Sequence, residues 1–230
     1  MIERTWMRRL WYLTCQSIFR VGGMTAFGVR YYGLENVPRN GGLLVASNHQ
    51  SNLDPMLIGG GFPRRMNYLA RKTLFKNKLF SRMMAALDAI PIDRDGFGLD
   101  GVRETLRRLK AGEPVLVFPE GTRSPDGEIQ AFKPGFAAMA VRTKASILPM
   151  AIEGAFAAWP RRRRFPRCMP VRVQCGVAMG PDEIAKYGER EIVALVEVRV
   201  RECHAMLRRL PVFANTTHAR GIEYDIHGNS

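Results

Sequence analysis

The sequence predicts a single α/β domain in which a mixed, mostly parallel sheet is flanked by helices, preceded by an N-terminal amphipathic helical segment. Short apolar runs alternate with segments of helical periodicity between residues 43 and 152, as in parallel sheets with crossover helices. At 230 residues with 46% hydrophobic side chains, the chain suits one such core and is too short for two full domains. We expect residues 1–32 to form the N-terminal segment, 33–212 the α/β domain and 213–230 a loose polar tail.

The helix predicted over residues 4–20 is amphipathic. Its apolar face carries Met7, Leu10, Trp11 and Ile18, and its polar face carries Arg9, Gln16 and Arg20. Large aromatic side chains opposite arginines are typical of a helix in a membrane interface, although a helix packed on its own domain is equally compatible. Residues 21–32, interrupted by Gly22 and Gly23, are expected to form a short partner helix. The sequence contains no run of about 20 apolar residues, which is the length needed to span a bilayer.

Apolar runs bounded by polar residues predict the strands of the sheet. These runs lie at residues 43–46, 66–70, 89–92, 115–118 and 147–152, and an alternating run at 171–179 predicts a further strand. Helices are predicted from residue 54, over residues 74–88, 99–110 and 136–143, and as one long element over 182–209. Because ligands bind beyond the carboxyl ends of strands in open α/β sheets, the polar turns that follow the strands are expected to converge into a site.

The chain is strongly basic, with 35 Lys and Arg against 21 Asp and Glu, a formal charge of +14 and a pI near 10.3. Such a charge attracts polyanions, which leaves nucleic acid, an anionic membrane and phosphorylated small molecules open. The four cysteines have no C-x-x-C spacing, and none lies at a metal-ligand interval from a histidine, so we expect reduced thiols and no metal site. The N-terminus also lacks the features of a secretory signal.

His49 and Asp54 are the candidate catalytic pair. Residues 48–55, Asn-His-Gln-Ser-Asn-Leu-Asp-Pro, follow a buried strand and lead into a helix. A histidine acts as a general base at neutral pH when a partner fixes its tautomer, and Asp54 is placed to do this. The alternative is that Asp54 caps the helix before Pro55 and that His49 is an ordinary polar residue.

Four motifs in this order resemble those of the glycerolipid acyltransferase family, whose best-known members are the 1-acyl-glycerol-3-phosphate acyltransferases. The motifs are N-H-x-x-x-x-D-P at residues 48–55, I-D-R at 92–94, V-F-P-E-G-T-R-S at 117–124 and I-L-P-M-A-I at 147–152. The resemblance covers about residues 30–155 and implies the acyltransferase fold. It also implies direct transfer of an acyl group from a thioester to a hydroxyl, with His49 as base and Asp54 as its partner.

The resemblance further implies an acceptor that carries a phosphate. Substrate contacts are expected from Arg71, Arg94, Glu120, Gly121, Thr122 and Arg123. Arginine offers a forked pair of donors to phosphate oxygens, and Arg71 stands where the family often has lysine, which is not an equivalent residue. Glu120 is expected to orient an arginine or to bind an acceptor hydroxyl.

The expected partners are an acyl-CoA or acyl carrier protein donor, a lysophospholipid acceptor and an anionic membrane surface, with no nucleic acid. The favoured acceptor is 1-acyl-sn-glycerol-3-phosphate; glycerol 3-phosphate, another lysophospholipid or a lyso-ornithine lipid remain alternatives. No cofactor is implied. We expect a peripheral or monotopic protein at the cytoplasmic face of the membrane, with the basic loop at residues 161–164 docking there or binding the donor.

Two other classes of function remain to be compared with this interpretation. A nucleic-acid-binding protein would explain the high pI and would leave His49 without a special role. A serine hydrolase would use Ser47, Ser51 or Ser124 together with His49, although the sequence contains no G-x-S-x-G motif. Neither alternative accounts for four motifs in order.

Overall fold

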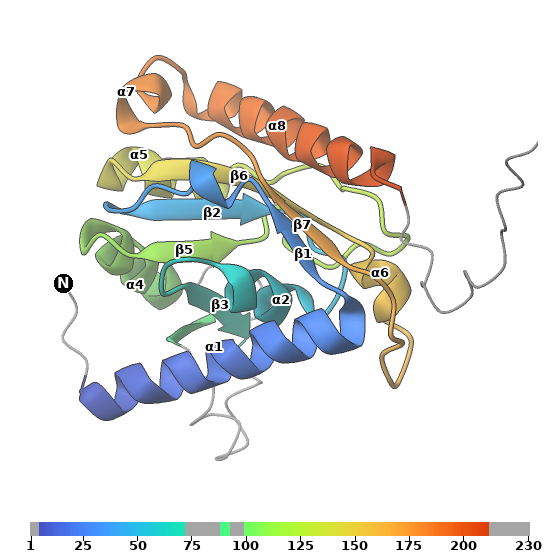
Figure 1. Cartoon of the computed structure of the whole chain (residues 1–230). Coiled ribbons are helices and arrows are strands. Elements are labelled where there is room, and N and C mark those ends of the chain that lie inside the picture. Colours follow the sequence, from blue (N-terminus) through green and yellow to red (C-terminus); the bar gives the residue numbers. More distant parts are fainter. Residues whose placement is uncertain (1–4, 72–87, 93–98, 212–230) are drawn as a thin grey trace, which may run out of the picture.

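A seven-stranded sheet forms the centre of the structure, a computed structural model that describes residues 5–71, 88–92 and 99–211 (Figure 1). The strands are β1 (Arg30–Tyr32), β2 (Leu43–Ser47), β3 (Asn67–Arg71), β4 (Ala89–Ile92), β5 (Pro114–Val117), β6 (Ser146–Glu153) and β7 (Arg172–Cys175). Their order in space is β1-β7-β6-β2-β5-β3-β4, and among these pairings β6 with β7 is antiparallel while the others are parallel. The predicted mixed, mostly parallel sheet is confirmed.

Helices cover both faces of this sheet (Figure 1). They are α1 (Trp6–Phe27), α2 (Asp54–Gly61), α4 (Leu99–Lys110), α5 (Gly135–Thr143), α6 (Ala155–Ala158), α7 (Pro181–Ile184) and α8 (Glu189–Arg209), with a 3-10 turn at Leu34–Asn36. In β2, Leu44 and Ala46 belong to the core beneath α5 and α8, whereas Leu43 and Val45 belong to the core beneath α2. Burial on both faces explains why the central strands are apolar throughout.

Helix α1 packs on the outside of α2 as a further layer. Tyr12 and Cys15 are its buried side chains, and the Met66 amide donates a 2.8 Å hydrogen bond to the Tyr12 hydroxyl. The helix runs without a break through Gly22 and Gly23, so the predicted partner helix over residues 21–32 is wrong. A Cβ at Gly23 would lie 3.2 Å from the Leu57 side chain, which indicates that this glycine serves the approach of α1 to α2 rather than ending the helix. Residues 30–32 instead form the edge strand β1.

The outer face of α1 presents a continuous set of large apolar side chains to solvent. Its exposed members are Trp6, Met7, Leu10, Trp11, Leu13, Ile18, Val21 and Met24. The helix therefore packs on its own domain through one narrow stripe and leaves its apolar face uncovered by the described residues. Within the described part of the chain, no helix combines the length and the apolarity needed to cross a bilayer.

The other predicted elements within the described residues agree with the structure except near two glycines, whereas α6 and the 3-10 turn were not predicted. The strand predicted over residues 171–179 ends at Cys175, and its pairing with β6 resumes only as an isolated bridge between Ile147 and Met179. The helix predicted over 182–209 is divided into α7 and α8, since the Gly188 amide donates to the Glu191 carboxylate and starts a new helix. The helix predicted over 74–88 lies almost wholly outside the described residues, and the tail at 213–230 entirely so.

We predict that Tyr12→Phe destabilises the protein by about 1–3 kcal/mol, because the buried Met66 amide loses its acceptor while the aromatic ring is kept. Urea unfolding followed by circular dichroism measures this change. Leu13→Ala is the control, since Leu13 lies on the outer face of α1 and is 57% exposed. An equal loss in both variants would contradict the docking of α1 through Tyr12.

Candidate active site

The segment between β2 and α2, residues 48–53, brings His49 against Asp54, and it is here called the catalytic loop because it carries the predicted base His49. His49 Nδ1 lies 2.8 Å from Asp54 Oδ2. The Asp54 side chain is fully buried, whereas 17% of the His49 side chain is exposed. The histidine therefore faces the surface while its partner is fixed in the interior.

Asp54 is held by backbone as well as by histidine. Its Oδ2 accepts hydrogen bonds from the Gln50 amide at 2.6 Å and from the Ser51 amide at 2.7 Å. The helix cap is Leu53, and Asp54 is the first residue of α2. The interpretation of Asp54 as an ordinary N-cap is therefore wrong, because its carboxylate closes the catalytic loop. Its Oδ1 is buried and has no hydrogen-bond partner among the described residues.

The imidazole ring of His49 is fixed in plane as well as in tautomer. It stacks on Phe118, with ring centroids 3.9 Å apart and an interplanar angle of 12°. A proton on Nδ1 satisfies the Asp54 carboxylate, which leaves the lone pair of Nε2 to accept a proton. The described residues provide no hydrogen bond to Nε2, so this nitrogen is available to a substrate hydroxyl.

Glu120 joins the loop after β5 to the catalytic loop. Its Oε1 accepts a hydrogen bond from the His49 amide at 2.7 Å, and its Oε2 accepts one from the Gln130 amide at 3.0 Å. Burial raises the pKa of Glu120 above its ordinary value, although both amide hydrogen bonds act in the opposite direction. In return, the Ser124 amide donates to the His49 carbonyl at 2.7 Å. The sequence predicted an arginine or a substrate hydroxyl as partner of Glu120; its described hydrogen bonds are to backbone amides.

The basic residues predicted to bind substrate are placed only in part. Arg123 is half-buried and directly precedes Ser124. Gly121 adopts a left-handed conformation with φ of 72°, and a Cβ there would lie 3.0 Å from Lys133 Nζ. Thr122 is exposed. These three motif residues therefore lie on the turn beside the catalytic loop, with Lys133 packed over it.

Two predicted contacts fall where the structure gives no side chain to place. Arg94 lies outside the described residues, and Arg71 is the last residue of β3, with an undescribed side chain. The expected convergence of polar turns is observed for the strands β2, β5 and β6. Asn48 contributes to it by exchanging two hydrogen bonds with the Ile152 backbone, at 2.9 and 2.8 Å.

Three further residues near the site were not predicted from the sequence. Gln50 is buried, and its Nε2 donates to the Gly127 carbonyl at 2.9 Å and to Glu153 at 3.2 Å. His204 of α8 forms an ion pair with Glu153. The residues around His204 in the sequence give no indication of this contact, because Glu153 lies far from it along the chain. Gln50 could have been noticed, since it lies within the first motif.

The geometry argues against a serine hydrolase. The Ser51 hydroxyl donates to the Trp159 carbonyl at 2.9 Å, and the Ser124 hydroxyl contacts Asp126 at the same distance. The Ser47 hydroxyl lies 3.2 Å from the Asn48 carbonyl. All three side chains are buried, and each hydroxyl is directed to a partner other than the His49 ring, so none is placed as a nucleophile.

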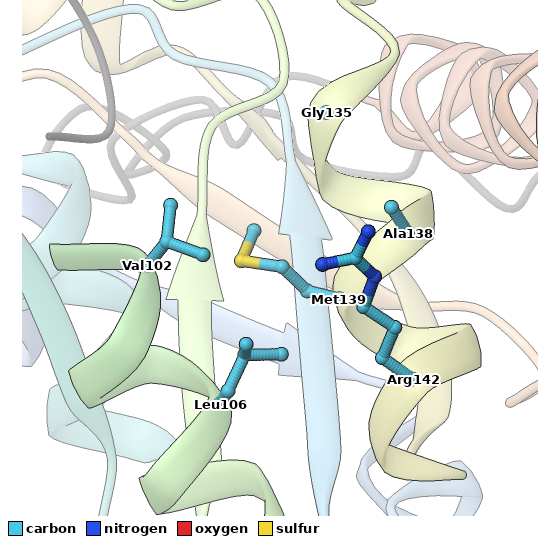
Figure 2. Close-up of a pocket in the computed structure, with 6 residues that line it drawn as sticks. All are labelled: Val102, Leu106, Gly135, Ala138, Met139 and Arg142. Carbon is cyan, nitrogen blue, oxygen red and sulfur yellow. The ribbon is translucent and has the colours of Figure 1, made fainter. Parts of the chain in front are cut away.

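A surface pocket of about 200 Å³ lies between α4 and α5 (Figure 2). It is lined by Val102, Leu106, Gly135, Ala138, Met139 and Arg142. None of these residues belongs to the four motifs. The pocket therefore shares no residue with the predicted site.

The described residues contain no cluster of three or more His, Cys, Asp or Glu side chains suited to a metal ion. All four cysteines are free thiols, and Cys168 is the exposed one. Burial raises the pKa of Cys175 to about 12 and that of Cys203 to about 11. These two thiols are therefore protonated near neutral pH and are poor nucleophiles.

The chain is similar in sequence and in fold to known acyltransferases. A family model described as acyltransferase matches residues 28–153, more than half of the chain. A 1-acyl-sn-glycerol-3-phosphate acyltransferase of Bacillus subtilis is 33% identical over 144 residues, which are 62% of this chain and 71% of the relative. One of the same name from Pseudomonas aeruginosa is 33% identical over 174 residues, 71% of this chain and 66% of the relative.

A solved structure extends the likeness beyond the motifs. The crystal structure of the 1-acyl-sn-glycerophosphate acyltransferase PlsC from Thermotoga maritima superposes with a TM-score of 0.79 at 27% sequence identity. The match covers 92% of this chain and 86% of the other. With the matched family model and the relative from Bacillus, this likeness shows that the chain belongs to the acyltransferase family.

Proposed function

We propose that this protein is a 1-acyl-sn-glycerol-3-phosphate acyltransferase, which moves a fatty acyl group from acyl-CoA or acyl carrier protein to the free hydroxyl of a lysophospholipid. The observation that carries the proposal is the 2.8 Å contact of His49 Nδ1 with buried Asp54, in a chain of the acyltransferase family. The names of the relatives from Bacillus subtilis and Pseudomonas aeruginosa support this acceptor.

His49 supplies the base that the reaction needs. An alcohol is barely ionised at neutral pH, so Nε2 takes the proton of the acceptor hydroxyl as its oxygen attacks the thioester carbonyl carbon. Asp54 stabilises the imidazolium that forms, and the stacked Phe118 ring keeps it in plane. The new C–O bond forms, the C–S bond breaks, and the leaving thiolate takes the proton back from Nε2. No covalent enzyme intermediate and no cofactor are required.

The acceptor phosphate is proposed to bind the basic residues that follow the strands. Arg123 and Lys133 lie at the turn beside the catalytic loop, and we assign Arg71 and Arg94 to the same phosphate from the motif pattern. Glycerol 3-phosphate, another lysophospholipid and a lyso-ornithine lipid are the competing acceptors. Assays with each acceptor and with both donors decide between them.

The apolar face of α1 is proposed to lie in the interface of an anionic membrane. The loop with Arg161–Arg164 and the exposed Phe165 is proposed as a second contact. This loop begins near the site, because the Ser51 hydroxyl donates to the Trp159 carbonyl. It ends beside α1, where the Val171 amide donates to the Phe27 carbonyl. We place the protein at the cytoplasmic face, where both candidate donors are available.

His49→Ala is expected to lower kcat by about 10²–10⁴-fold, the usual contribution of a general base. The measurement is transfer of a labelled acyl group to 1-acyl-sn-glycerol-3-phosphate in mixed micelles, with folding checked by circular dichroism. His227→Ala removes a histidine of the tail and is the matched control. Equal kcat in wild type and His49→Ala would exclude His49 as the base.

Arg123→Ala is expected to raise KM for 1-acyl-sn-glycerol-3-phosphate about tenfold or more, because a charge-assisted hydrogen bond to phosphate is lost. The same variant should leave kcat/KM nearly unchanged for a monoacylglycerol, which has no phosphate. Arg142→Ala, an exposed arginine outside the motifs, is the control. An equal loss of kcat/KM with both acceptors would show that Arg123 does not bind the phosphate.

Replacing Leu10 and Ile18 together by serine should weaken binding to anionic vesicles at least about tenfold, because each large apolar side chain contributes about 1.5–3 kcal/mol when buried. Sedimentation with vesicles of phosphatidylglycerol measures this. The matched control is Val198→Ser with Met206→Ser on α8, since these residues are similarly exposed, at 51% and 55% against 57% and 61%. If both pairs weaken binding equally, α1 is not the membrane contact.

A further inference from the structure

We propose that His204 and Glu153 are positioning residues, which fix the catalytic loop through the side chain of Gln50. The inference rests on the proposed roles of His49 and Asp54. It assigns a function in catalysis to α8, which lies outside the residues 28–153 matched by the family model.

Gln50 connects the two parts of this arrangement. Its side chain is 2% exposed, and its Nε2 donates to the Gly127 carbonyl at 2.9 Å and to Glu153 Oε2 at 3.2 Å. Its Oε1 accepts the Phe156 amide at 3.3 Å. The Gln50 backbone amide donates to Asp54 Oδ2 at 2.6 Å. A shift of the Gln50 side chain therefore moves a donor that holds the partner of His49.

Glu153 accepts a hydrogen bond from the Gln50 side chain and is itself paired with His204 of α8. Glu153 ends β6, and its Oε2 is paired with Nε2 of His204, which is 4% exposed. Arg208 Nε lies 3.6 Å from the same oxygen. Burial alone would raise the pKa of Glu153, but the hydrogen bonds from His204 and Gln50, with the charges of His204 and Arg208, together bring the pKa below its ordinary value. Glu153 is therefore an anion that accepts donors from Gln50 and from α8.

Helix α8 is suited to serve as the anchor. Val200, Cys203 and Leu207 are buried in the core beneath it, on the same helix as His204. The carboxyl-terminal end of α8 lies at the same end of the sheet as the arrowheads of β2 and β6 (Figure 1). Motion of the catalytic loop is therefore restrained by an element that is packed against β6, β7 and β2.

Stability alone does not account for this pair. A buried ion pair loses hydration, and replacing it by well-packed apolar residues often leaves stability unchanged or raises it. A catalytic group, by contrast, loses rate when it is displaced by a fraction of an ångström. The hydrogen bonds from His204 to Asp54, through Glu153 and Gln50, serve that requirement directly.

The test compares His204→Leu, His204→Gln and Gln50→Met with the control Arg201→Gln. Arg201 also ties α8 to the loop after β5, through the Ile129 carbonyl at 3.0 Å, but not through Gln50. His204→Leu and Gln50→Met are expected to lower kcat about tenfold with KM changed less than about twofold. Arg201→Gln should change neither by more than about twofold, and His204→Gln, which keeps a donor at the position of Nε2, should recover most of the lost kcat.

A second readout does not depend on activity. In protein with isotope-labelled histidine, the Nδ1–H proton of His49, assigned by its absence from His49→Ala, reports the hydrogen bond to Asp54. This signal should persist in Arg201→Gln and should shift or broaden in His204→Leu and Gln50→Met. If the wild type transfers no acyl group, the proposed function fails. The Nδ1–H signal of His49 still shows whether His204 and Gln50 position the His49 ring.

Two results would overturn the inference. One is an unchanged His49 signal in both His204→Leu and Gln50→Met, whether or not kcat falls. The other is a fall in kcat of the same size in Arg201→Gln, which would indicate general loosening of α8. Should His204→Leu fail to fold, Gln50→Met decides alone, because methionine has the length of glutamine and removes its hydrogen bonds.

Discussion

The hydrogen bonds to the Asp54 carboxylate are the constraint on which the site depends. One oxygen accepts three donors, the ring nitrogen of His49 and the amides of Gln50 and Ser51. These bonds close a tight turn between a buried strand and a helix, and they set the ring orientation at the same time. Because the carboxylate is fully buried, it has no water to replace a lost donor, so the turn and the contact of His49 with Asp54 form or fail together.

Neighbouring loops are joined to this turn by hydrogen bonds between polar groups. Glu120 binds the His49 amide from the loop after β5, and Asn48 binds the Ile152 backbone of β6. Such groups are buried at the edge of the sheet, where each must find a partner or lose free energy. The polar residues at the carboxyl ends of the strands thus stabilise the fold and arrange the site with the same bonds.

Helix α1 has one face packed on its own domain and one exposed apolar face. Tyr12 and the other inward residues dock it on α2, whereas Trp6, Leu10 and Ile18 are left exposed. Uncovered apolar side chains on this scale are unfavourable in water and are typical of surfaces that bind a partner or a lipid interface. The segment that carries the arginines at residues 161–164 begins at Trp159, near the catalytic loop, and ends at Val171, beside α1. In the proposed function, the same surface that holds the protein at the membrane brings His49 to its lipid acceptor.

The sequence by itself determined the strands other than β1, most helices, and the pairing of His49 with Asp54, because these depend on periodicity and on residues close in the chain. The helix through Gly22 and Gly23 and the partners of Glu120 were decided by packing between distant segments, whereas the break at Gly188 follows from its local hydrogen bond to Glu191. His204 shows the limit most clearly, since 154 positions separate it from Gln50, which it approaches within 3.4 Å. Its role depends on the crossover of the chain over the sheet, and local sequence does not encode which buried groups that crossover brings together.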